Sequence, residues 1–254
     1  MQILLASAKI MNSSAKLADS LHTTEPMFRK EAADFARDMA EYDTSAIADM
    51  LGCSKQIAAQ NKLRFMQFFD DSPTLPVILA YHGQAYKHLK AETFSADDLT
   101  YAQEHLWITS FLYGLLRPLD GIRPYRMEGK VELPSGNGCT MTAFWRERLT
   151  DMLINAVKGD DGILLHLSTA EFEHLFDWQR VRREVRVVQP LFYVDQGDSL
   201  KIQAVWAKTC RGAMTRFIID NRIAAPEALQ AFSYEGFSFQ PRLGEPDYPH
   251  FVKS

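Results

Sequence analysis

The densest group of side chains able to do chemistry lies near the middle of the chain, between Ser110 and Gly129. Besides three arginines, this stretch holds tyrosines, acids and prolines, namely Tyr113, Pro118, Asp120, Pro124, Tyr125 and Glu128. Proline fixes φ and lacks a backbone donor, so the segment is predicted to follow a rigid path after Leu116. The guanidinium groups of Arg117, Arg123 and Arg126 suit a phosphate or a carboxylate, but they also suit a buried salt-bridge cluster. Composition alone leaves both alternatives open.

A second group of cations is predicted on one helix, from Lys208 to Ile223. At about 100° per residue, one face of this helix collects four side chains: Lys208, Arg211, Thr215 and Arg222. The opposite face is apolar and predicted to be core. Gly212 lies among the arginines and would let another segment or a ligand approach the helix closely.

Three short apolar runs, at 2–6, 77–80 and 163–167, are predicted to be buried strands. Each is followed by polar residues, and the polar residues nearest the strand ends include Lys9, Tyr86 and Glu171. In open α/β sheets ligands commonly bind at the carboxyl ends of strands. These side chains are therefore candidates for a site, although an ordinary surface lysine also explains Lys9.

Residues 44–68 are predicted to form two helices separated by Gly52, with Ser54 capping the second helix. The spacing matches a helix-hairpin-helix, which binds DNA through backbone N–H groups without reading bases. The predicted hairpin contacts are Gly52, Ser54 and Lys55. Because only one hairpin glycine is present, an αα-hairpin that merely packs is the alternative.

Composition excludes several classes of protein. The chain has 254 residues, a net charge of −4 and three dispersed cysteines, so neither a disulfide framework nor a zinc ribbon is supported. It has no apolar run of membrane-spanning length and no signal-peptide pattern, which predicts a cytoplasmic protein with no membrane partner. Standard nucleotide and hydrolase motifs are absent, and no cofactor or metal is expected, even at the run that contains His166, Ser168, Glu171 and His174. No linker or repeat divides the chain, which predicts one compact α+β domain over 1–254, with a mixed central sheet, flanking helices and a basic cleft.

Several segments together resemble the YaaA peroxide-stress protein family: YGLLRPLD-x-x-x-PYR, AETFSADD, the pair Phe144–Trp145 and KTCRGAMTRFIIDNR. The resemblance implies an unusual bacterial α+β fold with a positively charged cleft and a helix-hairpin-helix element, and functions in DNA binding and peroxide protection. Residues at matching motif positions include Lys9, Asn61, Arg64, Phe65, Gly83, Tyr86, Ser110, Glu171, Lys208, Arg211, Gly212, Arg216 and Asn221. The sequence departs from the family pattern at strand ends, where Ala6 and Ser7 replace a Ser-Pro pair and His82 replaces a lysine.

Two functions and one structural alternative follow. The first is a DNA-binding stress protein that holds duplex or branched DNA in a basic cleft without base readout. The second is an enzyme that acts on a small anionic or nucleotide-like substrate through lysine, glutamate and tyrosine acid–base chemistry, which a deep pocket would favour. A purely structural polar core is the third alternative, and the oligomeric state stays open. The candidate cleft residues are Lys9, Arg64, Tyr86, Tyr113, Arg117, Asp120, Tyr125, Arg126, Glu128, Glu171, Lys208, Arg211 and Arg216.

Overall fold

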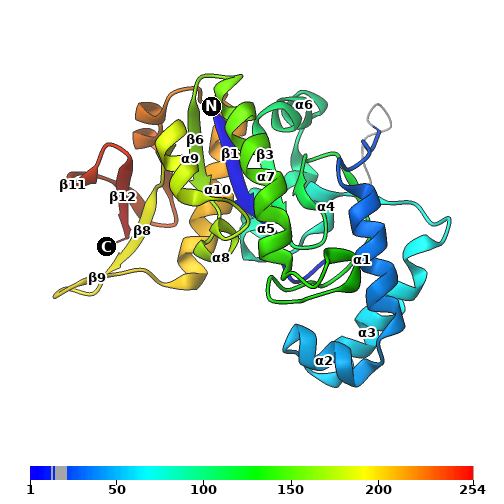
Figure 1. Ribbon diagram of the computed structural model, residues 1–254. Helices are drawn as coiled ribbons and strands as arrows, with labels where there is room; N and C mark the ends of the chain where they lie inside the picture. The colour runs from blue at the N-terminus through cyan, green and yellow to red at the C-terminus, as the bar shows by residue number, and fades with distance from the viewer. Residues whose placement is uncertain (13, 15–21, 254) are drawn as a thin grey trace.

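The computed structural model describes residues 1–12, 14 and 22–253, and it is built around a mixed five-stranded sheet (Figure 1). The strand order is β4-β3-β1-β6-β7. These strands are β1 (Gln2–Ala6), β3 (Leu106–Ser110), β4 (Gly114–Leu116), β6 (Ile163–Leu167) and β7 (Arg186–Val188). The central strand β1 pairs in parallel with β3 and β6, whereas β4 runs antiparallel to β3. The predicted mixed central sheet is confirmed, and the carboxyl ends of β1, β3 and β6 meet at one edge.

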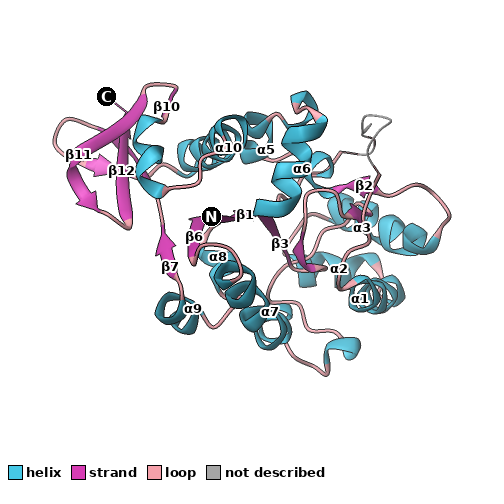
Figure 2. Ribbon diagram, turned by 90° about the horizontal axis from the view of Figure 1, so that it is seen from above, coloured by secondary structure: helices cyan, strands magenta, loops and turns pink. Residues whose placement is uncertain are grey.

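Helices cover both faces of this sheet, as Figure 2 shows from above. One layer contains α5 (Gln84–Leu89), α6 (Ala96–His105) and α10 (Ala204–Asn221). The other contains α7 (Met141–Lys158), α8 (Ala170–Glu173) and α9 (Trp178–Glu184). Strands with helices on both faces are buried on both sides, which explains why β1 and β6 are mostly apolar, apart from the buried Gln2 and His166.

A second five-stranded sheet packs beside α10 near the C-terminus. Its order is β10-β11-β12-β8-β9, with β8 (Leu191–Asp195), β9 (Leu200–Lys201), β10 (Ser233–Tyr234), β11 (Phe237–Glu245) and β12 (Tyr248–Lys253). Phe192, Phe237 and Phe251 fill its core with ring centroids 5.6–6.3 Å apart. Residues 185–194 and 200–206 have the sequence pattern of two strands joined by a turn, and β8 and β9 form this turn. The second strand does not reach Trp206, because α10 begins at Ala204.

The segment before β2 is helical, with α1 (Arg29–Glu41), α2 (Thr44–Leu51), α3 (Lys55–Met66) and the 3₁₀ turn η1 (Gln67–Phe69). Asp43 caps α2 and Ser54 caps α3, each accepting a backbone N–H. Gly52 ends α2 with φ of +56°, a left-handed conformation that favours glycine. The two predicted helices around Gly52 are therefore present. None of the helices in the described ranges has the length and apolar character needed to cross a membrane.

Residues 77–80 were predicted to be a strand, and this prediction is wrong. They form the single helical turn α4 (Val77–Ala80), which follows the two-residue strand β2 (Leu75–Pro76) paired with β5 (Gly121–Ile122). All four side chains of α4 are buried, and a short buried helix has no periodicity that separates it from a buried strand. The remaining 3₁₀ turns are η2 (Ala91–Thr93), η3 (Pro134–Gly136) and η4 (Pro226–Ala231).

Candidate functional site

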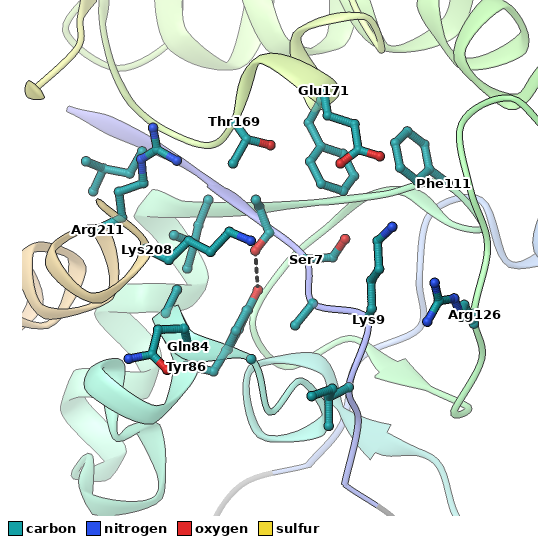
Figure 3. Close-up of a pocket in the computed structure, with 18 of the residues that line it drawn as sticks. Ser7, Lys9, Gln84, Tyr86, Phe111, Arg126, Thr169, Glu171, Lys208 and Arg211 are labelled. Carbon is teal, nitrogen blue, oxygen red and sulfur yellow. Dashed lines mark hydrogen bonds between the residues drawn. The ribbon is translucent and has the colours of Figure 1, made fainter. Parts of the chain in front are cut away.

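A cavity of about 560 Å³ opens at the carboxyl ends of β1 and β6 (Figure 3). Segments far apart in the sequence form its walls: the loop after β1, the start of α5, the central loop around Arg126, the start of α8, and α10. Its polar side chains are those of Ser7, Lys9, Gln84, Tyr86, Tyr125, Arg126, Thr169, Glu171, Lys208 and Arg211. The sequence thus predicted many residues that meet at one sheet edge.

Two glycines allow the cavity walls to approach each other. A Cβ on Gly212 of α10 would lie 1.8 Å from the carbonyl oxygen of Ala85 in α5, so only glycine permits this packing. A Cβ on Gly83 would lie 2.6 Å from the Cβ of Ala8, in the loop after β1. The close approach at Gly212 that the sequence suggested is therefore made by another segment of the same chain.

One side of the cavity holds two cations that share a carboxylate. Lys9 Nζ donates to Glu128 Oε2 at 2.7 Å, and the Arg126 guanidinium donates to Glu128 Oε1 at 3.0–3.2 Å. Only 10% of the Glu128 side chain is exposed, and both its oxygens are occupied by these cations. Glu128 therefore fixes Lys9 and Arg126 and cancels part of their positive charge. We call Lys9, Arg126 and Glu128 the paired wall.

Lys208 and Arg211 lie on the cavity side of α10, and we call them the unpaired wall (Figure 3). Among the described residues, neither side chain has a hydrogen-bond acceptor or an ion-pair partner, in contrast to Lys9 and Arg126. Burial lowers the pKa of Arg211, and the nearby negative charge of Glu173 partly opposes this effect. Arg211 is half-buried, and a guanidinium that keeps its donors free toward a cavity is a strong binding group for an anion.

Glu171 projects into the cavity from α8, and Figure 3 shows its carboxylate and the Lys9 ammonium directed toward the same space. A contact with β6 holds the short helix α8 in place, because His166 Nε2 on β6 and Glu173 Oε1 on α8 lie 2.8 Å apart. Burial lowers the pKa of His166, although its bond to Glu173 opposes the shift. Sequence reasoning missed Glu173, since its importance depends on a contact with β6 that no local motif encodes.

Two tyrosines also border the cavity, namely Tyr86 on α5 and Tyr125 in the central loop. The Tyr86 hydroxyl donates to the carbonyl oxygen of Ala6 at 3.0 Å (Figure 3). The Tyr125 hydroxyl lies 2.6 Å from both the Tyr81 hydroxyl and the Ser110 hydroxyl. Burial raises the pKa of Tyr125 to about 12, so its phenol is neutral and carries its hydrogen at physiological pH.

Arg117 and Asp120 were predicted in the cleft, but the structure places them away from the cavity. The Arg117 guanidinium lies 3.2 Å from the centroid of the Trp107 ring and donates to Gln2 Oε1 and to two backbone carbonyls. Burial lowers its pKa to about 10. Asp120 accepts the Arg117 backbone N–H at 2.8 Å and the Thr24 hydroxyl at 2.7 Å. Both residues fix the central loop, as in the structural alternative.

Tyr113, Arg216 and Arg64 were also predicted in the cleft and lie elsewhere. The Tyr113 hydroxyl accepts the backbone N–H of Arg123 at 3.2 Å. Arg216 donates to the carbonyl oxygen of Lys90 at 3.0 Å and pairs with Asp220 on its own helix. Arg64 lies on α3, within the helical segment before β2. Spacing along a helix gives a residue's face but not the neighbour that this face meets, so these positions were not separable in the sequence.

The predicted DNA contacts Gly52, Ser54 and Lys55 form the α2–α3 turn, which lies apart from α5, α8 and α10 in Figure 1, and none of the three lines the cavity. The Gly52 N–H is used to cap α2, and the Ser54 hydroxyl accepts the N–H of Ile57. The two helices and the glycine turn between them are present, whereas the helix-hairpin-helix assignment and DNA binding stay predictions. In the ranges that the structure describes, no group of three His, Cys, Asp or Glu side chains is arranged to hold a metal ion.

Comparison with known proteins gives a consistent result over nearly the whole chain. The family described as "Peroxide stress protein YaaA" matches residues 1–243. A UPF0246 protein of Bacteroides thetaiotaomicron is 46% identical over 246 residues, which cover 96% of this chain and 95% of that protein. A UPF0246 protein of Porphyromonas gingivalis is 44% identical over 254 residues, with 99% of each chain covered. The more distant UPF0246 protein RD1_0358 of Roseobacter denitrificans is 34% identical over 235 residues, covering 91% of this chain and 90% of that protein.

Proposed function

This chain belongs to the peroxide stress protein YaaA family, and we propose that it is a peroxide-stress protein that binds a small anionic molecule in the cavity between β1, β6 and α10. The observation that carries the proposal is the unpaired wall. Lys208 and Arg211 border a cavity of about 560 Å³ and have no protein partner among the described residues. That volume is typical of sites for small molecules.

The charges around the cavity favour an anion of low molecular weight. The cations Lys9, Arg126, Lys208 and Arg211 outnumber the acids Glu128 and Glu171. Removing a guanidinium from water is costly unless an opposite charge and hydrogen bonds replace the water. An anion seated on Arg211 would supply both, and a planar carboxylate or a phosphate fits its fork of donors.

The same cavity holds groups suited to proton transfer. Glu171 and Lys9 approach one space from different walls, and the short α8 that carries Glu171 is pinned by the His166–Glu173 contact. A carboxylate and an ammonium held near a bound anion can act as base and acid. This favours the enzymatic alternative over a cleft that only binds phosphates of DNA.

A titration with inorganic phosphate tests the proposed function. Calorimetry on the intact protein is expected to show binding that falls at least about 100-fold in the double variant Lys208→Gln, Arg211→Gln, because both unpaired cations are lost. The matched control is Lys201→Gln, which removes an exposed lysine on β9, outside the cavity. Equal phosphate affinity in the double variant and the control would contradict the proposal.

DNA binding at the α2–α3 turn is a second candidate function, favoured by one observation. Lys55 follows the turn, and a Cβ on Gly52 would lie 3.7 Å from Lys130 Nζ, so two lysines flank the left-handed turn. Such a site would contact phosphates only, and its affinity would fall steeply with salt. Lys55→Glu, tested on duplex DNA at low and high salt, is expected to weaken binding that the double cavity variant leaves intact. Salt-independent binding, or none at low salt, would contradict this second function.

The link to peroxide is proposed to be indirect. Cys210 is buried in α10, and burial raises the pKa of its thiol to about 12, which disfavours the thiolate that reacts with peroxide. The three cysteines are free thiols in the structure, which suits the cytoplasm we propose. Survival of bacteria lacking their own family member, exposed to hydrogen peroxide, is expected to be restored by this protein and by Cys210→Ala, but not by the double cavity variant. Rescue by the double cavity variant would contradict the role of the cavity in protection.

A further inference from the structure

Three hydroxyl groups form a buried chain behind the cavity. Tyr125 lies in the middle, 2.6 Å from Tyr81 on one side and 2.6 Å from Ser110 on the other. The three groups carry three hydrogens, but the two contacts between them use only two. One hydrogen therefore needs an acceptor outside the chain of hydroxyls.

The direction of the Ser110 bond follows from the groups around its oxygen. The Ser110 hydroxyl accepts the backbone N–H of Leu112 at 3.2 Å and that of Tyr113 at 2.9 Å. These two bonds occupy both lone pairs of the Ser110 oxygen. Ser110 must therefore donate its own hydrogen to Tyr125, and Tyr125 cannot donate to Ser110.

The spare hydrogen then belongs to Tyr81 or to Tyr125. Within the described part of the chain, the hydroxyl groups near that of Tyr81 are those of Tyr125 and Ser110. The Ser110 oxygen already accepts two backbone N–H groups, so the Tyr125 oxygen is the acceptor left for Tyr81. Tyr81 is 2% exposed and borders a smaller cavity, of about 220 Å³, whose wall contains Ile78 and Leu79 but also polar residues such as Asn12 and Glu92. Tyr125 instead borders the cavity of about 560 Å³ that contains the unpaired wall. Placing the spare hydrogen on Tyr125 gives it access to a ligand, and a buried donor left without an acceptor is costly.

We propose that Tyr81 and Ser110 both donate to the Tyr125 oxygen, and that Tyr125 donates its own hydrogen to an oxygen of the molecule bound in the cavity. Because the phenol oxygen accepts two short hydrogen bonds, it is polarised and its own donation is strengthened. This is the arrangement that stabilises negative charge developing on an oxygen.

The inference rests on the proposed binding of an anion in the same cavity and makes the ligand class narrower. The ligand would carry a carboxylate or phosphate for Lys208 and Arg211 and, in addition, a carbonyl, enolate or phenolate oxygen for Tyr125. Acid–base chemistry at Glu171 or Lys9 beside such an oxygen would be proton abstraction next to a carbonyl, with the charge received at Tyr125.

Binding of substituted phenolates of one shape but rising basicity tests the inference, with Tyr125→Phe and Tyr81→Phe as variants and inorganic phosphate as a second probe. The unsubstituted protein is expected to bind the more basic phenolates more tightly. Tyr125→Phe should bind them about tenfold more weakly and without this dependence, while phosphate affinity stays the same. Tyr81→Phe should keep the dependence with a shallower slope, because one of the two donors to the phenol is gone.

Three results would overturn the inference. These are an unchanged dependence on basicity in Tyr125→Phe, a complete loss of phenolate binding in Tyr81→Phe, and no phenolate binding by the unsubstituted protein. Loss of phosphate binding in the cavity variants is a separate result that concerns the proposed function alone. Both tyrosine substitutions keep the ring, and thermal unfolding of each variant checks that the fold is retained.

Discussion

Arg117 and Arg211 are both half-buried arginines, and desolvation lowers the pKa of each. Arg117 lies against Trp107 and donates to three oxygens of its own chain. Arg211 borders the cavity and has no hydrogen-bond acceptor among the described residues. The difference separates a cation that holds the fold together from one whose donors are left for a ligand. In a buried charge the bonds that are already made reveal its role better than burial does.

The largest effect is expected from breaking the packing that positions Arg211. Gly212→Ala would place a Cβ 1.8 Å from the Ala85 carbonyl oxygen and force α10 away from α5. We expect a loss of about 3 kcal/mol or more in the free energy of unfolding, measured by chemical denaturation. Gly159→Ala is the control, since Gly159 has φ of −72° and its nearest atom lies at 3.2 Å. Equal losses in the two variants would refute the packing argument.

A smaller effect on stability is expected at Arg117. Arg117→Ala removes the stacking on Trp107 and the hydrogen bonds that the guanidinium donates to Gln2 Oε1 and to two backbone carbonyls. The free energy of unfolding should fall by about 2–3 kcal/mol. Urea denaturation measures this loss. A variant as stable as the unsubstituted protein would show that Arg117 does not stabilise the fold.

Arg211→Gln is expected to change the free energy of unfolding by less than about 1 kcal/mol. The substitution removes a buried charge that makes no hydrogen bond in the described protein, so its desolvation cost disappears along with its weak attraction to Glu173. The same denaturation experiment checks it. A loss of unfolding free energy as large as that of Arg117→Ala would show that Arg211 also stabilises the fold. The proposed difference between the two arginines would then be wrong.

The cavity wall formed by α8 should be sensitive to acid. Burial lowers the pKa of His166 below its ordinary value, with Glu173 opposing and Arg211 and Arg182 adding to the decrease. A lowered pKa means that the folded protein favours neutral His166, so this stability is present above the ordinary histidine pKa and is lost as pH falls below it. Unfolding free energy measured between pH 7 and pH 5 should decline less in His166→Gln. An identical decline in both proteins would contradict this origin.

Sequence patterns predicted the parts of the fold that depend on local chemistry. The buried strands β1 and β6, the cap Ser54 and the left-handed end of α2 at Gly52 all follow from neighbouring residues. Residues 77–80 failed, because an apolar run of four buried residues is the same for a strand and a helical turn. The single-domain prediction over 1–254 stays a prediction.

The candidate site was predictable only in part, for a related reason. The ends of the predicted strands and one face of the predicted helix indicated four residues that do border one cavity: Lys9, Glu171, Lys208 and Arg211. Arg117 and Arg126 have the same side chain and lie in similar sequence surroundings. Neighbouring residues in the sequence therefore do not show that Arg126 lies beside the cavity and Arg117 against Trp107. That distinction arises from contacts between distant segments, as does the role of Glu173 beneath α8.

The most direct measurement of the contrast is the increase in Tm that inorganic phosphate produces in three proteins: unsubstituted, Arg117→Ala and Arg211→Gln. A ligand that binds only the folded state raises Tm, and the increase grows with the logarithm of the ratio of its concentration to its Kd. We expect Arg117→Ala to unfold at lower temperature yet gain the same increase, and Arg211→Gln to unfold near the original temperature yet gain almost none. Loss of the phosphate effect in Arg117→Ala, or its retention in Arg211→Gln, would contradict the assignment of the cavity as an anion site.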